Sequence, residues 1–202
     1  KIILLIFYLF IFSNSAKALV EVDITRGNLD PLPIAVSPLH VDIKSEDFQG
    51  LNIKNLGADI SKIIEINFKN TGLFNPLERD AFVQKPDIAH LKPRFEDWRL
   101  IKAQALVTGK LLVKDGKLKV EFRLWDLTAA QEMTALAFTT TPSNWRRVAH
   151  IISDKIYERL TGEEGYFDTR IIYVAESGPK NQRVKKLAIM DQDGFNNKYL
   201  TL

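Results

Sequence analysis

One stretch of the chain has the apolar spacing of a helix that must be covered along one side. Its apolar residues follow one another at intervals of four, three, one and four positions, which places them on one side of a helix: Leu56, Ile60, Ile63, Ile64 and Phe68. We expect this helix to run from about Asn52 to Asn70, with Gly72 as a candidate C-terminal cap. Burial of each such side chain contributes roughly 1.5–3 kcal/mol before entropy is subtracted. The helix is therefore predicted to pack on a sheet.

Several other segments alternate apolar and polar residues with the period of a β-strand. Residues 20–25 (VEVDIT) alternate strictly, whereas residues 32–39 (LPIAVSPL) are mostly apolar and are expected to lie centrally in the sheet. Three longer strands are predicted over residues 103–114, 117–127 and 133–141. The pair Asp115-Gly116 separates the first two of them, and such a pair between alternating runs predicts a tight hairpin.

A second amphipathic helix follows the last of these strands. Thr141 is expected to be its N-cap and Pro142 its first residue, while Gly162 is expected to end it. Its apolar side consists of Trp145, Val148, Ile152, Ile156 and Leu160. The order of strands and helices predicts an α+β fold, an α/β sandwich of two helices on a mixed β-sheet, which closes at about residue 162.

The chain begins with a segment typical of a secretory signal. Lys1 precedes an apolar run of eleven residues, Ile2 to Phe12, which is too short to cross a bilayer as a helix, since that needs about 20 residues. Ala16 and Ala18 form an A-x-A cleavage site. We expect a signal peptide over residues 1–18, removal of it after Ala18, and export to the periplasm without stable membrane insertion. The alternative is an uncleaved membrane anchor.

Charge and cysteine content exclude several classes of function. The 28 basic and 25 acidic residues leave a formal charge of +3, and without Lys1 and Lys17 the balance is 26 to 25, or +1. Nucleic-acid binding needs a concentrated basic surface, so no nucleic-acid partner is expected. The sequence has no cysteine, which excludes disulfides, thiolate zinc sites and a cysteine nucleophile.

No residue cluster in the sequence predicts catalysis, a metal or a cofactor. His150 falls on the polar side of the second helix and is expected at the surface, and His40 and His90 lie in loops without a partner at metal-ligand spacing. The segment MDQDGFN (190–196) resembles the start of a calcium loop, but position 202 holds Leu202 where the loop needs a Glu. This segment is therefore predicted to be a turn between two strands.

The strand pattern of residues 20–25 allows two interpretations. An alternating strand near a free end can add to the sheet edge of another protein, where main-chain hydrogen bonds provide affinity. It can equally pair within its own domain, and the pattern alone favours that internal pairing.

Several short motifs together resemble the TolB family of the Tol-Pal system. They are LTG (160–162), F-x-T-R-I (167–171), YV (173–174) and D-x-DG (191–194), preceded by LFNPL (73–77), V-x-G (107–109) and Trp145. The resemblance extends over essentially the whole chain. It implies a helix–sheet N-terminal domain over residues 19–165, followed by a β-propeller. Residues 166–202 would then be the truncated start of that propeller, an incomplete first blade.

The resemblance also implies a function. Proteins of this family are non-enzymatic periplasmic interaction proteins that link TolA to the lipoprotein Pal and support outer-membrane integrity and cell division. The TolA C-terminal domain is bound by the mature N-terminal strand, which matches Leu19, Val20, Glu21, Val22, Asp23 and Ile24 in this chain. The Pal site lies on the propeller, which is mostly absent here. No cofactor is implied.

The alternative is the N-terminal fragment of a propeller-containing periplasmic peptidase. Propellers also precede hydrolase domains in proteins similar to prolyl oligopeptidase. The sequence downstream of Leu202 distinguishes the two: repeated D-x-DG blades favour the TolB family, and a G-x-S-x-G motif favours the peptidase.

Overall fold

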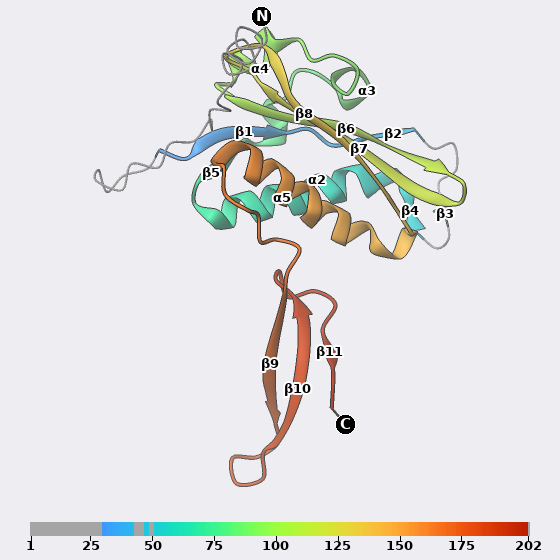
Figure 1. Cartoon of the computed structure of the whole chain (residues 1–202), viewed down its shortest axis with the longest axis vertical. Coiled ribbons are helices and arrows are strands. Elements are labelled where there is room, and N and C mark those ends of the chain that lie inside the picture. Colours follow the sequence, from blue (N-terminus) through green and yellow to red (C-terminus); the bar gives the residue numbers. More distant parts are fainter. Residues whose placement is uncertain (1–29, 43–46, 49–50, 202) are drawn as a thin grey trace, which may run out of the picture.

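The computed structural model describes residues 30–42, 47–48 and 51–201, and in it two helices cover one face of a mixed sheet (Figure 1). The 6-stranded sheet has the strand order β5-β1-β6-β7-β8, and β2 also pairs with β6. Strands β1, β2 and β5 form parallel pairs, whereas β6, β7 and β8 are antiparallel. The strands are β1 (Leu32–Val36), β2 (His40–Asp42), β5 (Phe74–Pro76), β6 (Ala105–Lys114), β7 (Lys117–Asp126) and β8 (Gln131–Thr140). The predicted α/β sandwich is therefore confirmed.

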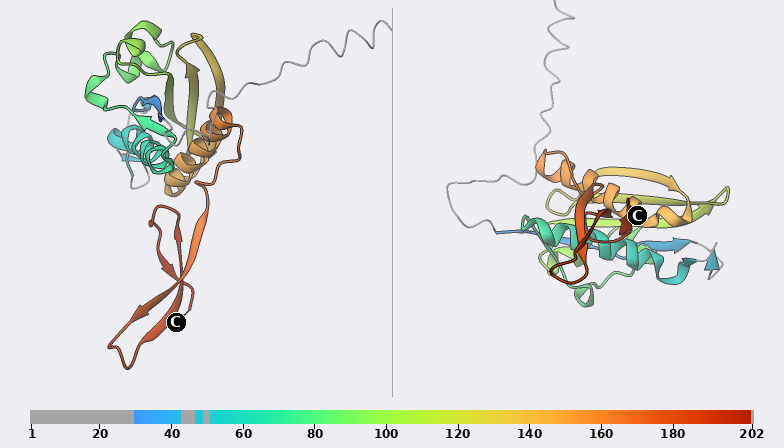
Figure 2. Two further views of the ribbon diagram at one scale, coloured as in Figure 1. Left: turned by 90° about the vertical axis from the view of Figure 1, so that its left-hand side faces the viewer. Right: turned by 90° about the horizontal axis from the view of Figure 1, so that it is seen from below.

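Helices α2 (Ile53–Thr71) and α5 (Trp145–Thr161) lie side by side across the sheet, as Figure 2 shows from a second direction. Their apolar sides form one core with the inner face of the sheet, and Ile60, Phe68 and Ile152 are fully buried there. Neither helix of the described part is long and apolar enough to span a membrane, nor is any other helix there.

The opposite face of the sheet is partly covered by the connection from β5 to β6. This connection contains η2 (Arg79–Ala81), α3 (Pro86–Ala89) and α4 (Phe95–Leu100). A second, smaller core forms beneath it around Trp98, Leu106 and Trp125. Gln84 stabilises this core, because its side-chain oxygen accepts from the Trp98 indole N–H at 3.0 Å.

The helix ends show where local sequence determines structure and where it does not. Gly72 and Gly162 adopt the left-handed conformation, with φ values of 71° and 81°, and cap α2 and α5 as predicted. The expected N-cap at Thr141 is wrong for α5. Residues Pro142–Asn144 form a separate 3-10 turn, η3, and α5 begins at Trp145 without a side-chain cap. Proline at the first position starts a helical turn, but here the chain continues as a 3-10 turn before the α-helix.

The remaining strands form two small sheets. Strands β3 (Asp47–Phe48) and β4 (Leu51–Asn52) pair just before α2. At the other end, β9 (Arg170–Ser177), β10 (Val184–Asp191) and β11 (Lys198–Tyr199) form a 3-stranded antiparallel sheet below the helices (Figure 1). The predicted turn at residues 190–196 is confirmed, since Asp191 ends β10 and the chain returns as β11.

Gly57 lies where α2 approaches the segment after β1 most closely. A Cβ atom at Gly57 would lie 2.1 Å from the carbonyl oxygen of Leu39, and the Leu39 N–H donates to the Gly57 carbonyl at 3.2 Å. We predict that Gly57→Ala lowers the free energy of unfolding by about 1–3 kcal/mol, the usual cost of forcing atoms into a packed site.

Chemical denaturation measures this loss. Helix propensity alone predicts the opposite, a gain of about 1 kcal/mol for Gly→Ala. The control is Asn55→Ala at an exposed site of the same helix, which should be neutral or stabilising. A stabilised Gly57→Ala variant would show that the close approach is unimportant.

Candidate interaction surfaces

The segment predicted to bind TolA lies outside the described residues. Leu19 to Ile24 and the predicted cleavage residue Ala18 all precede residue 30, where the described chain begins. The structure shows a contact that the sequence did not predict. The turn after β10 packs against α2 and α5.

Asp193 and Gln192 make the polar part of this contact. The Arg146 guanidinium on α5 donates to the Asp193 carboxylate at 2.5 Å, and both side chains are largely buried. The Gln192 amide donates to the Asn67 side-chain oxygen on α2 at 2.9 Å. Phe195 adds a cation–π contact, because the Arg146 guanidinium lies 3.6 Å from its ring centroid. The turn is thus held by charge, hydrogen bonds and a cation–π contact.

His150 lies beneath this turn, and its expected surface position is wrong. Its side chain is only 2% exposed. Nδ1 lies 3.0 Å from the amide nitrogen of Asn67, which can only donate, so Nδ1 accepts and the neutral ring carries its proton on Nε2. Nε2 faces the Asp193 carboxylate at 3.4 Å. The helix pattern missed this burial because the polar side of α5 faces the polar residue Asn67 of α2 rather than solvent.

The pKa of His150 is lowered by this environment. Burial is the largest cause, since it disfavours the charged ring. The Asp193 carboxylate opposes the shift, and the Arg146 guanidinium adds to it. His150 is therefore held in its neutral form by the packing of the two helices and the turn.

A second anchor joins the middle of α5 to the segment just before β9. The Asp154 carboxylate accepts from the backbone N–H of Phe167 at 2.6 Å and of Asp168 at 3.1 Å. Burial raises the pKa of Asp154, and the two N–H groups oppose that shift. The Phe167 ring is buried in the main core, where it packs edge-on against Phe68 and Tyr157. The chain is thus fixed to the helical layer before it enters β9.

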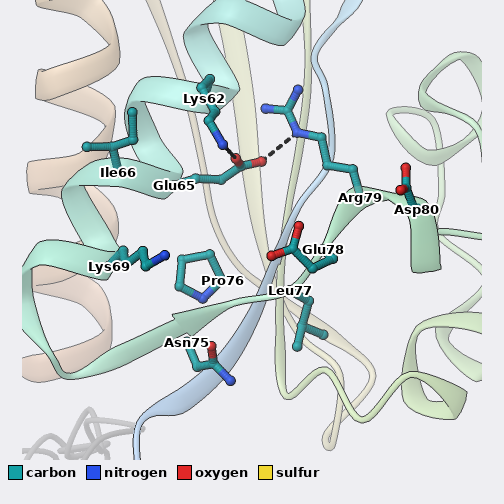
Figure 3. Close-up of a pocket in the computed structure, with 10 residues that line it drawn as sticks. All are labelled: Lys62, Glu65, Ile66, Lys69, Asn75, Pro76, Leu77, Glu78, Arg79 and Asp80. Carbon is teal, nitrogen blue, oxygen red and sulfur yellow. Dashed lines mark hydrogen bonds and ion pairs between the residues drawn. The ribbon is translucent and has the colours of Figure 1, made fainter.

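A groove of 240 Å³ lies between α2 and residues 75–80 (Figure 3). At its wall, the Glu65 carboxylate pairs with Arg79 at 2.6 Å and with Lys62 at 3.4 Å. Arg79 also donates to the carbonyl of Ala58 at 3.1 Å. The Glu65 carboxylate is thus paired with two cations from α2 and η2, and these contacts hold η2 against α2 at the wall of the groove.

The other two histidines lie together, which the sequence did not predict, and His40 begins strand β2 instead of lying in a loop as expected. The rings of His40 and His90 stack with centroids 4.4 Å apart, and His90 Nδ1 lies 2.9 Å from the Pro86 carbonyl oxygen. Over the part of the chain that the structure describes, no group of three or more His, Asp or Glu residues could hold a metal ion.

Comparisons with known proteins agree with the motifs in the sequence. The family model of the TolB amino-terminal domain matches residues 20–133. The Tol-Pal system protein TolB of Pelagibacter ubique (strain HTCC1062) is 69% identical over 200 residues, which cover 98% of this chain and 45% of that protein.

A solved structure has the same fold. The crystal structure of TolB from Acinetobacter baumannii matches with a TM-score of 0.68 and 24% sequence identity, over 92% of this chain and 40% of that one. The present chain therefore spans less than half the length of either relative.

We predict that the free energy of unfolding decreases as the pH falls below about 6.5, the ordinary pKa of histidine. The pKa of His150 is lower in the folded than in the unfolded chain, so the unfolded chain binds more protons between the two values. The stability contribution of neutral His150 is complete above its pKa in the unfolded chain. It is lost as the pH falls through its pKa in the folded chain. Denaturant titrations at a series of pH values measure this loss.

The matched variants are His150→Gln and His40→Gln. The first should remove the pH dependence in this window, and the second should keep it because His150 is retained. If His150→Gln leaves the whole slope unchanged, another group is responsible for it.

Proposed function

The chain belongs to the TolB family of Tol-Pal system proteins, and from this we propose that it is a non-enzymatic interaction protein of the periplasm that links TolA to Pal. The observation that carries the proposal is the 69% identity to a Tol-Pal system protein TolB over nearly the whole chain. Outer-membrane integrity and cell division are the processes that such a link would support. Residues 1–18 serve as the signal peptide in this proposal, with cleavage after Ala18.

The TolA C-terminal domain is proposed to bind the mature N-terminal strand, Leu19 to Ile24. The alternation of Val20, Val22 and Ile24 with acidic residues suits a strand that adds to the edge of a partner sheet.

Pal is proposed to bind the propeller of the longer protein. The 3-stranded sheet of β9, β10 and β11 follows the N-terminal domain, for which we propose residues 19–165. We propose residues 166–202 as the incomplete first blade of the propeller. Since the chain covers 45% of its curated relative, most of the propeller surface lies beyond it. We therefore propose that the TolA contact of the TolA–Pal link lies within the residues of this chain and that the Pal contact lies on the propeller expected in the longer relatives.

We predict that deletion of residues 19–26 abolishes binding to the TolA C-terminal domain and leaves thermal unfolding nearly unchanged. The exported chain is first verified by intact mass to begin at Leu19, because strand addition needs that free end. Isothermal titration calorimetry then measures binding, and differential scanning calorimetry measures unfolding. A large loss of thermal stability with binding intact would mean that the segment is an internal strand of its own domain.

Point variants of the same segment test the strand mode. Proline at Val22 or at the neighbouring Asp23 removes one backbone donor, and neighbouring donors point to opposite sides of a strand. An added edge strand uses only one side, so one of the two variants should weaken binding far more than the other. Val22→Ile keeps the donor and the β-branched side chain and should bind normally.

A further inference from the structure

The two edges of the 6-stranded sheet differ in how they are protected. Strand β5 at one edge has three residues, and one of them is Pro76, which has no N–H to offer a further strand. Strand β8 at the other edge has ten residues, no proline and a single charged side chain, Glu132. A long edge with so little charge is a template for pairing with another strand.

The hairpin before β8 determines which of its backbone groups point outward. Asp115 and Gly116 form its two-residue turn with φ values of 51° and 70°, both positive as in a type I′ turn. The flanking pair Lys114 and Lys117 is therefore hydrogen-bonded across the hairpin. The N–H and C=O groups of successive residues in a strand point to opposite neighbouring strands. Those of the odd residues of β7 therefore point toward β6, and those of its even residues point toward β8. From Thr134 to Thr140, the even residues of β8 pair with these even residues of β7.

The odd residues of β8 from Met133 to Thr139 consequently direct their N–H and C=O groups away from the sheet. They are Met133, Ala135, Ala137 and Thr139. Met133 lies at a register shift, and its carbonyl accepts from Arg159 Nε of α5 at 3.3 Å. This end of the edge is therefore closed, whereas the following three odd residues have no strand beside them in the described part of the chain.

The inner face of the sheet is also incompletely covered at this edge. Leu136 is paired with Phe122 of β7, which is 1% exposed, yet Leu136 itself is 41% exposed. Phe138 stacks on Phe122 with centroids 6.2 Å apart and is only partly buried. The apolar surface of the core thus continues to the free side of β8.

We propose that β8 pairs antiparallel with β8 of a second copy of this chain, about a two-fold axis at Ala137. In this register Ala135 faces Thr139 of the second copy, and Ala137 faces its own equivalent. The three open residues of each copy then form about six main-chain hydrogen bonds, since each such pair exchanges two. With the axis at residue 135 or 136, the pairing would need the Met133 carbonyl, which already accepts from Arg159. With the axis at residue 138 or 139, the pairing would need residue 141, which lies beyond the end of β8.

Side chains fit the same register. Leu136 faces Phe138 of the second copy on the inner face, so each exposed apolar side chain gains an apolar neighbour. No charged residue occurs between Met133 and Thr140, so the pairing brings no like charges together. The interface is isologous, as expected for a two-fold dimer. It is also small, so a weak dimer that forms with rising concentration is expected.

Introduced cysteines test the register directly, because the chain has none of its own. Ala137→Cys places two thiols on a hydrogen-bonded pair, whose Cα atoms lie about 5.5 Å apart and can be bridged. The control Ala135→Cys has the same exposure and residue type, but its equivalent lies four positions away, at about 13 Å along the strand. Mild oxidation of the chain from Leu19 onward should cross-link the first variant at least several-fold more than the second.

A mixture of Ala135→Cys and Thr139→Cys chains should cross-link again, since these residues face each other across the axis. Equal cross-linking of Ala137→Cys and Ala135→Cys, or none in either, would overturn the proposal.

Sedimentation of cysteine-free chains provides an independent test. Ala137→Pro removes an outward donor but no hydrogen bond to β7, so the fold should persist, as circular dichroism can verify. Ala137→Val keeps the donor. Wild type and Ala137→Val should both dimerise with rising concentration, and Ala137→Pro should remain monomeric. Association that persists in Ala137→Pro would place it elsewhere, for example at β9–β11, and no association in wild type would exclude the dimer.

Discussion

Helix α2 buries three polar side chains, and the fold depends on providing each with a partner from a different segment. Ser61 donates to the Ser37 carbonyl at 2.9 Å, and Glu65 pairs with Arg79 at 2.6 Å. Asn67 reaches both α5 and the turn after β10. A buried polar group without a partner costs about 1–3 kcal/mol. The position of α2 therefore fixes the segment after β1, the connection after β5, α5 and the turn at once.

The sequence predicted those parts of the fold that local rules determine. Apolar periodicity located both helices, glycines marked their ends, and Asp115-Gly116 marked the hairpin. The features that the sequence did not predict depend on contacts between residues far apart in the chain. His150 has a polar pattern around it, and its burial follows from Asn67, 83 positions earlier. Arg146 and Asp193 lie 47 positions apart, and the sequence around either residue does not predict their contact. In the contact between the turn after β10 and the two helices, the turn could be predicted from the sequence. Its packing against α2 and α5 could not.

The two contacts that hold the terminal strands to the helical layer differ in kind. Phe167 is buried in the main core among aromatic rings, so the apolar part of its contact does not depend on protonation, although the Asp154 carboxylate that accepts from its N–H can titrate. The turn instead relies on the ion pair of Arg146 with Asp193 and on the neutral state of His150. Charged contacts weaken with salt and with protonation, whereas apolar burial does not. Conditions can therefore loosen the turn while the chain remains anchored at Phe167.

A chain that donates a strand to a partner must keep that strand apart from its own sheet. Strand β1 cannot be donated, since it pairs with β5 and β6 on its two sides and its residues Ile34, Ala35 and Val36 are fully buried. Removing it would expose the middle of the core. Donation of β1 to a partner is therefore excluded. The strand proposed for donation is instead the segment from Leu19 to Ile24, which precedes β1 in the sequence.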